Sequence, residues 1–162
     1  RFASAYTGVM ASETMNIKSG DLLYFSFHEG FTERLLSGDF RLKDSGKIEY
    51  ELKYFPSGSE QGALSSPMPL VERILELTCS GELESLPEKY CGGWDDAGSS
   101  YFEFRNGNEV KTVRINEVIK RDELSSNIEK ELFNINDEFI KLASTLVSHN
   151  KKLKGDAKSG AL

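Results

Sequence analysis

The chain has few of the residues on which most catalytic and metal sites depend. Among its 162 residues are only two histidines, two cysteines and one tryptophan. A histidine acid or base needs a nucleophile and an orienting carboxylate nearby, and a structural zinc site needs a full set of Cys or His ligands. Neither pattern surrounds His28, His149 or the cysteines. We therefore predict no catalytic residues, no metal site and no cofactor.

Long hydrophobic runs and an excess of positive charge are also missing. The longest apolar stretches, such as residues 22–27, fall far short of the roughly 20 residues that a membrane-spanning helix needs. Lys and Arg total 20 against 26 Asp and Glu, and the resulting net charge of −6 repels phosphate backbones. We predict neither a membrane span nor a nucleic-acid partner.

Alternating apolar and charged residues predict two β-hairpins. One covers residues 39–54 around the turn Asp44-Ser45-Gly46, and the other covers residues 101–115 around Asn106-Gly107. A short aromatic and aliphatic stretch, residues 22–27, predicts a buried strand before the first hairpin. The Gly- and Ser-rich run from Pro56 to Ser66 and the glycine-flanked run 92–98 are typical of loops.

Two amphipathic patterns predict helices. Ser66-Pro67 is typical of a helix start, and apolar spacing then extends the first helix over about 67–80. Ser126 followed by Glu129 forms a capping box for a second helix over about 126–150. The apolar stripe of that helix suits packing on a sheet and would also suit a coiled-coil seam.

The resulting order is β-β-β-α-β-β-α, which predicts an α+β fold. We expect a single antiparallel sheet with two helices packed on one face, formed by a single domain over residues 21–150. Residues 1–20 are interpreted as an N-terminal arm and residues 151–162 as a polar C-terminal tail.

The two cysteines lie close together in sequence, at the end of the first helix and in the following loop. The segment between them has only Leu83, Leu86 and Tyr90 to bury, so a tie between Cys79 and Cys91 would help to hold it. We predict a disulfide, with two unpaired thiols as the alternative. A disulfide indicates an extracytoplasmic or secreted protein, and unpaired thiols leave a cytoplasmic location open.

Trp94, Asp95 and Asp96 form the most distinctive local cluster. Adjacent carboxylates could bind calcium, but the alternating ligand pattern of a calcium loop is absent. The alternative is a buried Trp94 ring beside aspartates that cap turns.

One segment and the order of the elements resemble a known family. The stretch Leu83-Glu84-Ser85-Leu86-Pro87-Glu88-Lys89-Tyr90, followed by an acidic and glycine-rich stretch and a hairpin with Lys111 to Ile115, resembles the emfourin-like family over roughly residues 22–147. These are small bacterial proteins whose namesake inhibits thermolysin-type metalloproteases. The resemblance implies the fold and raises inhibition as an expectation, and it transfers no inhibitory residue. Residues 1–20, the run 56–66 and both cysteines differ from the family pattern.

These observations favour a non-enzymatic module that binds a protein partner through surface loops, and the resemblance raises protease inhibition as its expected role. Recognition residues are expected in the polar loops, since loops on a rigid scaffold often carry binding. A structural or assembly component and a hydrolase using Glu29, Asp95 and Asp96 are the alternatives, and the oligomeric state stays open. The candidate binding residues are His28, Glu29, Phe31, Glu60, Gln61, Trp94, Asp95 and Asp96.

Overall fold

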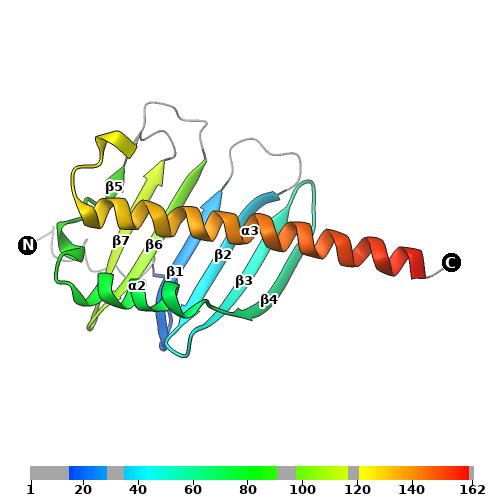
Figure 1. The fold of residues 1–162 in the computed structure, drawn as a ribbon, viewed down its shortest axis with the longest axis horizontal. Coiled ribbons are helices and arrows are strands. Elements are labelled where there is room, and N and C mark those ends of the chain that lie inside the picture. Colours follow the sequence, from blue (N-terminus) through cyan, green and yellow to red (C-terminus); the bar gives the residue numbers. More distant parts are fainter. Residues whose placement is uncertain (1–14, 29–34, 91–97, 117–120, 161–162) are drawn as a thin grey trace, which may run out of the picture.

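In the part of the chain that the structure describes, a seven-stranded sheet and two α-helices make up the fold (Figure 1). The computed structural model describes residues 15–28, 35–90, 98–116 and 121–160. The elements are β1 (Asp21–His28), β2 (Leu35–Lys43), β3 (Lys47–Tyr54), β4 (Ser59–Ser65), α2 (Met68–Cys79), the 3₁₀ turn η1 (Leu83–Ser85), β5 (Lys89–Tyr90), β6 (Ser99–Asn106), β7 (Glu109–Asn116), the 3₁₀ turn η2 (Arg121–Glu123) and α3 (Asn127–Gly160).

The strands lie in the order β4-β3-β2-β1-β6-β7-β5. Every neighbouring pair is antiparallel except β5 and β7, which pair in parallel. The predicted α+β class with a sheet is confirmed, and the purely antiparallel sheet is wrong. The chain returns from α2 alongside β7, where the Arg114 backbone N–H donates to the Glu88 carbonyl at 2.8 Å. A strand of two residues is too short to show alternation, so the sequence pattern did not reveal β5.

Edge strand β4 is the second correction, because the run 56–66 was predicted to be a loop. Ser59 to Ser65 instead pair with β3 along their whole length, from Lys53↔Ser59 to Lys47↔Ser65. Backbone ladders need no apolar side chains, so a polar, glycine-containing strand forms where its neighbour offers a complete partner. The Tyr50 ring fills the space at Gly62, where an added Cβ would meet Tyr50 Oη at 2.5 Å.

Both predicted helices are present. Helix α2 matches its predicted range within a residue at each end. At the start of α3 the capping box is confirmed, since Ser126 N–H donates to Glu129 Oε1 and Glu129 N–H donates to Ser126 Oγ, both at 3.3 Å. The helix then continues through residues 151–160, past its predicted end. Neither described helix is long and apolar enough to cross a membrane.

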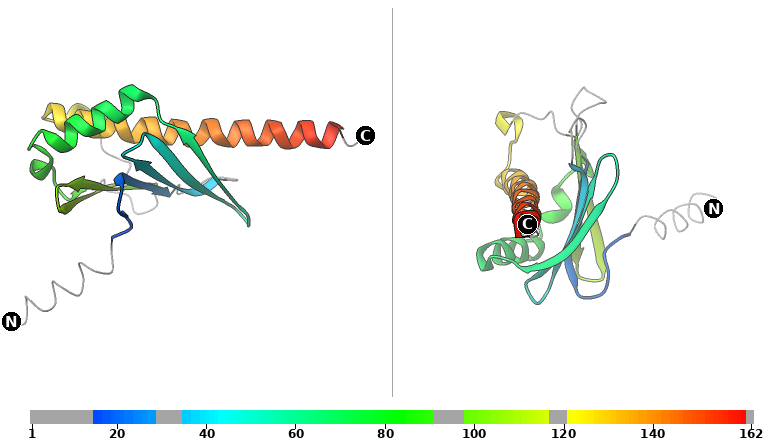
Figure 2. Two further views of the ribbon diagram at one scale, coloured as in Figure 1. Left: turned by 90° about the horizontal axis from the view of Figure 1, so that it is seen from below. Right: turned by 90° about the vertical axis from the view of Figure 1, so that its right-hand side faces the viewer.

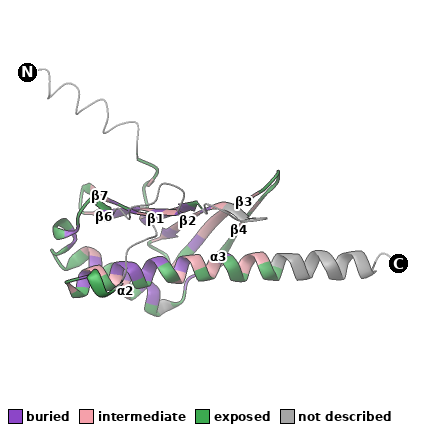
Figure 3. Cartoon of the chain, turned by 90° about the horizontal axis from the view of Figure 1, so that it is seen from above, coloured by how far each residue is buried: buried purple, intermediate pink, exposed green. Residues whose placement is uncertain are grey.

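The two helices lie on the same side of the sheet (Figures 2 and 3). The core lies between them and the sheet, where the Phe25 ring is 4.8 Å from that of Phe102 and 4.9 Å from that of Phe139 on α3. Arg73 of α2 joins the helices, because its guanidinium lies 2.5 Å from carboxylate oxygens of both Glu131 and Glu138. The covered face therefore carries the hydrophobic core, and neither α2 nor α3 lies over the opposite face of the sheet.

The segment behind the family resemblance is part of this core. Leu83, Leu86 and Tyr90 are all buried, and Tyr90 Oη donates to Glu129 Oε2 of α3 at 2.9 Å. The segment therefore folds back onto the sheet through its own side chains, which removes the packing reason given for a Cys79–Cys91 tie. Cys79 is exposed at the end of α2, and Cys91 lies outside the described residues. The disulfide stays a prediction, which intact mass with and without reductant tests.

Candidate functional site

The face of the sheet opposite to α2 and α3 has a polar, aromatic surface, here called the open face. Successive side chains of a strand point to opposite faces of the sheet, so every second residue of each strand lies on the open face. Pairing aligns them into cross-strand rows, with Tyr24 opposite Arg41 and Tyr101 opposite Arg114. The open-face side chains that matter below are Tyr24, Ser26, Asp39, Arg41, Glu49, Glu51, Gln61, Tyr101, Glu103 and Arg114.

Two tyrosines and two arginines lie at the centre of this face and are here called the Tyr–Arg cluster. The Arg41 guanidinium lies over the Tyr24 ring at 4.9 Å, and that of Arg114 lies over the Tyr101 ring at 5.2 Å. The two tyrosine rings meet edge to face at 6.4 Å. Cation–π and edge-to-face contacts hold all four side chains in fixed positions across β2, β1, β6 and β7.

Both tyrosines are held in the neutral form. Burial, with the Asp39 carboxylate adding to it, raises the pKa of Tyr24 to about 12. Burial and the adjacent Glu103 carboxylate raise the pKa of Tyr101 well above its ordinary value. At neutral pH these phenols are therefore hydrogen-bonding and packing groups, and neither is prepared to act as a base or nucleophile.

Glu103 is a buried carboxylate within the open face, and its partners come from the segment before β1. Its Oε1 accepts hydrogen bonds from the Asn16 and Ile17 backbone N–H groups at 2.7 and 3.0 Å, and its Oε2 accepts one from Asn16 Nδ2 at 2.9 Å. Arg41 and Arg105 donate to the carbonyls of Asn16 and Lys18. Residues 15–18, predicted to belong to an arm, are thus fastened to the sheet.

A second buried carboxylate stands at the start of β1. Asp21 is fully buried at its side chain and lies 3.0 Å from Arg41 and 2.5 Å from Lys43. Burial alone would raise its pKa, but hydrogen bonds from Lys43, the Lys18 backbone N–H and Arg41 outweigh burial and lower it. Asp21 therefore stays ionised and helps to fix Arg41, one of the members of the Tyr–Arg cluster.

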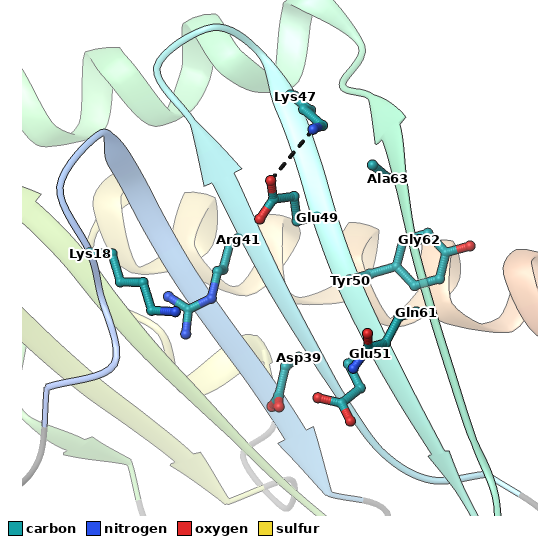
Figure 4. A pocket seen from close by; sticks show the side chains of 10 residues that line it. All are labelled: Lys18, Asp39, Arg41, Lys47, Glu49, Tyr50, Glu51, Gln61, Gly62 and Ala63. Atoms are coloured by element: carbon teal, nitrogen blue, oxygen red, sulfur yellow. Dashed lines mark ion pairs between the residues drawn. The ribbon is translucent and has the colours of Figure 1, made fainter.

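Two shallow hollows flank the cluster and share Asp39. The first has a volume of about 510 Å³ and lies over β2, β3 and β4 (Figure 4). It contains basic and acidic side chains in equal number: Lys18, Arg41 and Lys47 with Asp39, Glu49 and Glu51. Lys47 pairs with Glu49 at 3.5 Å, whereas Asp39 and Glu51 stand directly opposite each other on β2 and β3. Like charges in that position are destabilising.

The second hollow lies over the other side of the cluster and has a volume of about 470 Å³. It is lined by Asn16, Ser26, Phe27, His28, Ser37, Asp39, Ser99, Tyr101 and Arg114. Three of these residues, Ser26, Ser37 and Ser99, have small hydroxyl side chains, and Tyr101 and Arg114 belong to the Tyr–Arg cluster.

The open face collects only part of the predicted site. His28 lines the second hollow and Gln61 the first. Glu60 points to the helix side, where it accepts a hydrogen bond from Tyr54 Oη at 3.0 Å. The other five candidates, Glu29, Phe31, Trp94, Asp95 and Asp96, lie outside the described residues.

Sequence reasoning missed the Tyr–Arg cluster. The sequence did contain a signal in the alternation of each strand. All four cluster residues occupy positions whose side chains point away from the core: Tyr24, Arg41, Tyr101 and Arg114. Which of these positions become neighbours depends on the pairing of β1 with β6, and those strands are more than 70 residues apart in the chain. The sequence-based prediction placed the binding residues in the polar loops instead, because loops often carry recognition.

Within residues 15–28, 35–90, 98–116 and 121–160, no group of His, Cys, Asp and Glu is placed to hold a metal ion. No family model and no curated protein matches the chain. The emfourin-like resemblance therefore stays a prediction.

Proposed function

We propose that the chain is a non-enzymatic module that binds a protein partner on the open face of its sheet. The Tyr–Arg cluster is the observation that carries this proposal. Tyrosine and arginine are enriched among the residues that contribute most to protein–protein binding, because rigid rings and planar guanidinium groups give large contacts at low entropic cost. In this chain both kinds of side chain are already fixed before a partner arrives.

The charges around the cluster support a partner with a basic group at one point. Asp39 and Glu51 face each other on neighbouring strands, which costs stability in the free chain. A lysine or arginine of the partner placed between them would relieve that repulsion. The mixed charges elsewhere in the first hollow would set the orientation of the complex.

Site-specific photo-crosslinking tests the proposal. A photoreactive residue at Ser37 or Gln61 places the probe in one of the two hollows, and the same residue at Glu72 places it on the exposed side of α2. We expect one protein to be captured from Ser37 and Gln61 and not from Glu72. Capture from Glu72 alone would move the binding surface to the helices and refute the proposal.

The resemblance over Leu83 to Tyr90 makes a thermolysin-type metalloprotease the first defined partner to test. Inhibition titrations with the wild-type chain and with Arg114→Ala would show whether inhibition depends on the open face. Binding without inhibition would support a module and reject an inhibitor.

A further inference from the structure

One continuous row of open-face side chains runs across the sheet from β7 to β4, here called the charged row. Each member stands directly opposite the next in the strand pairing, in the order Arg114, Tyr101, Ser26, Asp39, Glu51 and Gln61. The members on β7, β6, β1 and β2 line the second hollow, and those on β2, β3 and β4 line the first. Figure 4 shows Asp39, Glu51 and Gln61 following one another across β2, β3 and β4. The charged row therefore passes through both hollows.

The charged row carries a positive charge at its β7 end and negative charges toward its β4 end. Arg114 supplies the first, and Asp39 and Glu51 supply the second. In the part of the chain that the structure describes, no ion pair joins any of these three side chains to another residue. Asp39 does accept a hydrogen bond from Tyr24 Oη at 3.1 Å, but a neutral phenol leaves the charge of the carboxylate uncompensated.

The neighbouring row of the open face differs, because its charged groups have partners within the chain. Arg41 lies 3.0 Å from Asp21, and Glu49 lies 3.5 Å from Lys47. Glu103 accepts three hydrogen bonds from the segment before β1. Two adjacent rows of one face thus differ in a single respect, and only the charged row has charges left to pair with another molecule.

Strand spacing sets the distance between the two kinds of charge. The Arg114 guanidinium lies over the Tyr101 ring, so its charge is displaced from β7 toward β6. Strands β2 and β3 are the second and third strands on from β6. At about 4.8 Å per strand, a point between Asp39 and Glu51 therefore lies roughly 12 Å from the guanidinium. Ser26 has the smallest side chain of the charged row and lies between the charges, so the row is lowest there.

We propose that the charged row binds an α-helix of the partner that carries an acidic residue and, two helical turns away, a basic residue. This inference rests on the proposed function and specifies the element of the partner that is bound. Residues i and i+7 lie on one side of a helix about 10 Å apart, and the length of their side chains covers the remaining difference. The acidic residue pairs with Arg114, and the basic residue lies between Asp39 and Glu51. An uncharged side chain from the turn between them enters the hollow above Ser26.

A helix suits this surface better than an extended segment does. The backbone groups of a helix are already paired with one another. An extended segment that lay across the strands would find none of the sheet's backbone groups to pair with, because those groups bond along the sheet.

Nuclear magnetic resonance titration of the full chain tests the proposal with two alanine-rich helical peptides of equal composition. One peptide carries Glu and Lys at i and i+7, and the other carries them at i and i+3. We expect the first to shift the backbone amide signals of Ser26, Asp39 and Arg114 and to bind about tenfold more tightly than the second. Equal affinity for the two peptides overturns the proposal, and so does an absence of shifts along the charged row with either peptide.

Charge reversal gives a readout that a structural role would not move. Arg114→Glu makes both ends of the charged row acidic, so the variant should prefer a peptide with Lys at both positions over the Glu and Lys peptide. Lys141→Glu on α3 changes the net charge equally and should keep the wild-type preference. The same switch in both variants would trace the effect to net charge and refute the proposal.

Photo-crosslinking from Ser37 and Gln61 separates this inference from the proposed function. Capture of one protein from both positions, together with peptide binding that ignores the spacing, rejects the helix and keeps the open face as the binding surface. Absence of capture from both positions rejects the inference together with the proposed function.

Discussion

The two faces of the sheet are built from the same strands, residue by residue, and yet they are stabilised in different ways. On the covered face, the row from Tyr50 through Phe40, Phe25 and Phe102 to Val113 is apolar and packs against α3. On the open face, carboxylates and guanidinium groups are held by hydrogen bonds and ring contacts. The covered face gains its stability from apolar area removed from water, which depends little on pH or salt. The open face depends on hydrogen-bonding and ionic partners for its charged groups, and this dependence makes its stability sensitive to single substitutions.

The largest effect is expected at the centre of the covered face. Phe25→Ala should lower the free energy of unfolding by about 3–5 kcal/mol, since the ring is fully buried among Phe40, Phe102 and Phe139. Urea unfolding measures the loss. Ser26→Ala, the next residue but on the open face, is the control and should cost less than about 1 kcal/mol. Equal losses would show that the two faces do not differ as described.

Glu103→Ala removes the buried carboxylate of the open face. We expect a loss of about 2 kcal/mol, because three hydrogen bonds to Asn16 and Ile17 disappear together. Amide hydrogen exchange should show faster exchange at Asn16 and Ile17, with the strand amides of β2 and β3 unchanged. Glu109→Ala, at an exposed position of β7, is the matched control. Unchanged exchange at Ile17 would contradict the anchoring role of Glu103.

Asp21→Asn should cost about 1.5 kcal/mol at neutral pH, because Arg41 and Lys43 lose their buried counter-charge. The folded state lowers the pKa of Asp21 below its ordinary 3.8. The stability that this group contributes is therefore fully present above the ordinary pKa and is lost as pH falls through the folded value. Unfolding free energies of wild type and variant, measured from pH 7 downward, should begin to converge as the pH falls below about 4 and should meet only below the lowered pKa of Asp21 in the folded state. A constant difference at all pH values would exclude the charge as its source.

Arg114→Ala separates binding from stability. The side chain is exposed, so its loss should change the free energy of unfolding by only about 0.5 kcal/mol. Photo-crosslinking from Ser37 should nevertheless fall about tenfold, since truncating a central arginine of an interface typically costs more than 1 kcal/mol of binding. Undiminished crosslinking would remove the Tyr–Arg cluster from the proposed surface.

The smallest expected effect is a gain in stability rather than a loss. Glu51→Gln should raise the stability by about 0.5 kcal/mol, because it removes the repulsion from Asp39 on the neighbouring strand. The same change should weaken partner capture from Gln61. Thermal unfolding measures the gain, with Glu76→Gln on the exposed side of α2 as control. A loss of stability would show that Glu51 has a stabilising partner and that the open face is not strained at this point.

Local patterns determined much of this protein from its sequence. Alternation at 39–54 and 101–115, the capping box at Ser126 and Glu129, and the apolar stripe of α3 all describe neighbours in the chain, where side-chain spacing alone decides which face is buried. The tertiary structure decided the rest. Strand β4 forms because β3 offers it a backbone ladder, β5 is parallel because the buried Leu83, Leu86 and Tyr90 direct the chain along β7, and Glu103 meets Asn16 across 87 residues. Tyr24 and Tyr101 become neighbours only through the register of β1 with β6. Such contacts join residues that have no fixed spacing in sequence, so only the folded backbone specifies them.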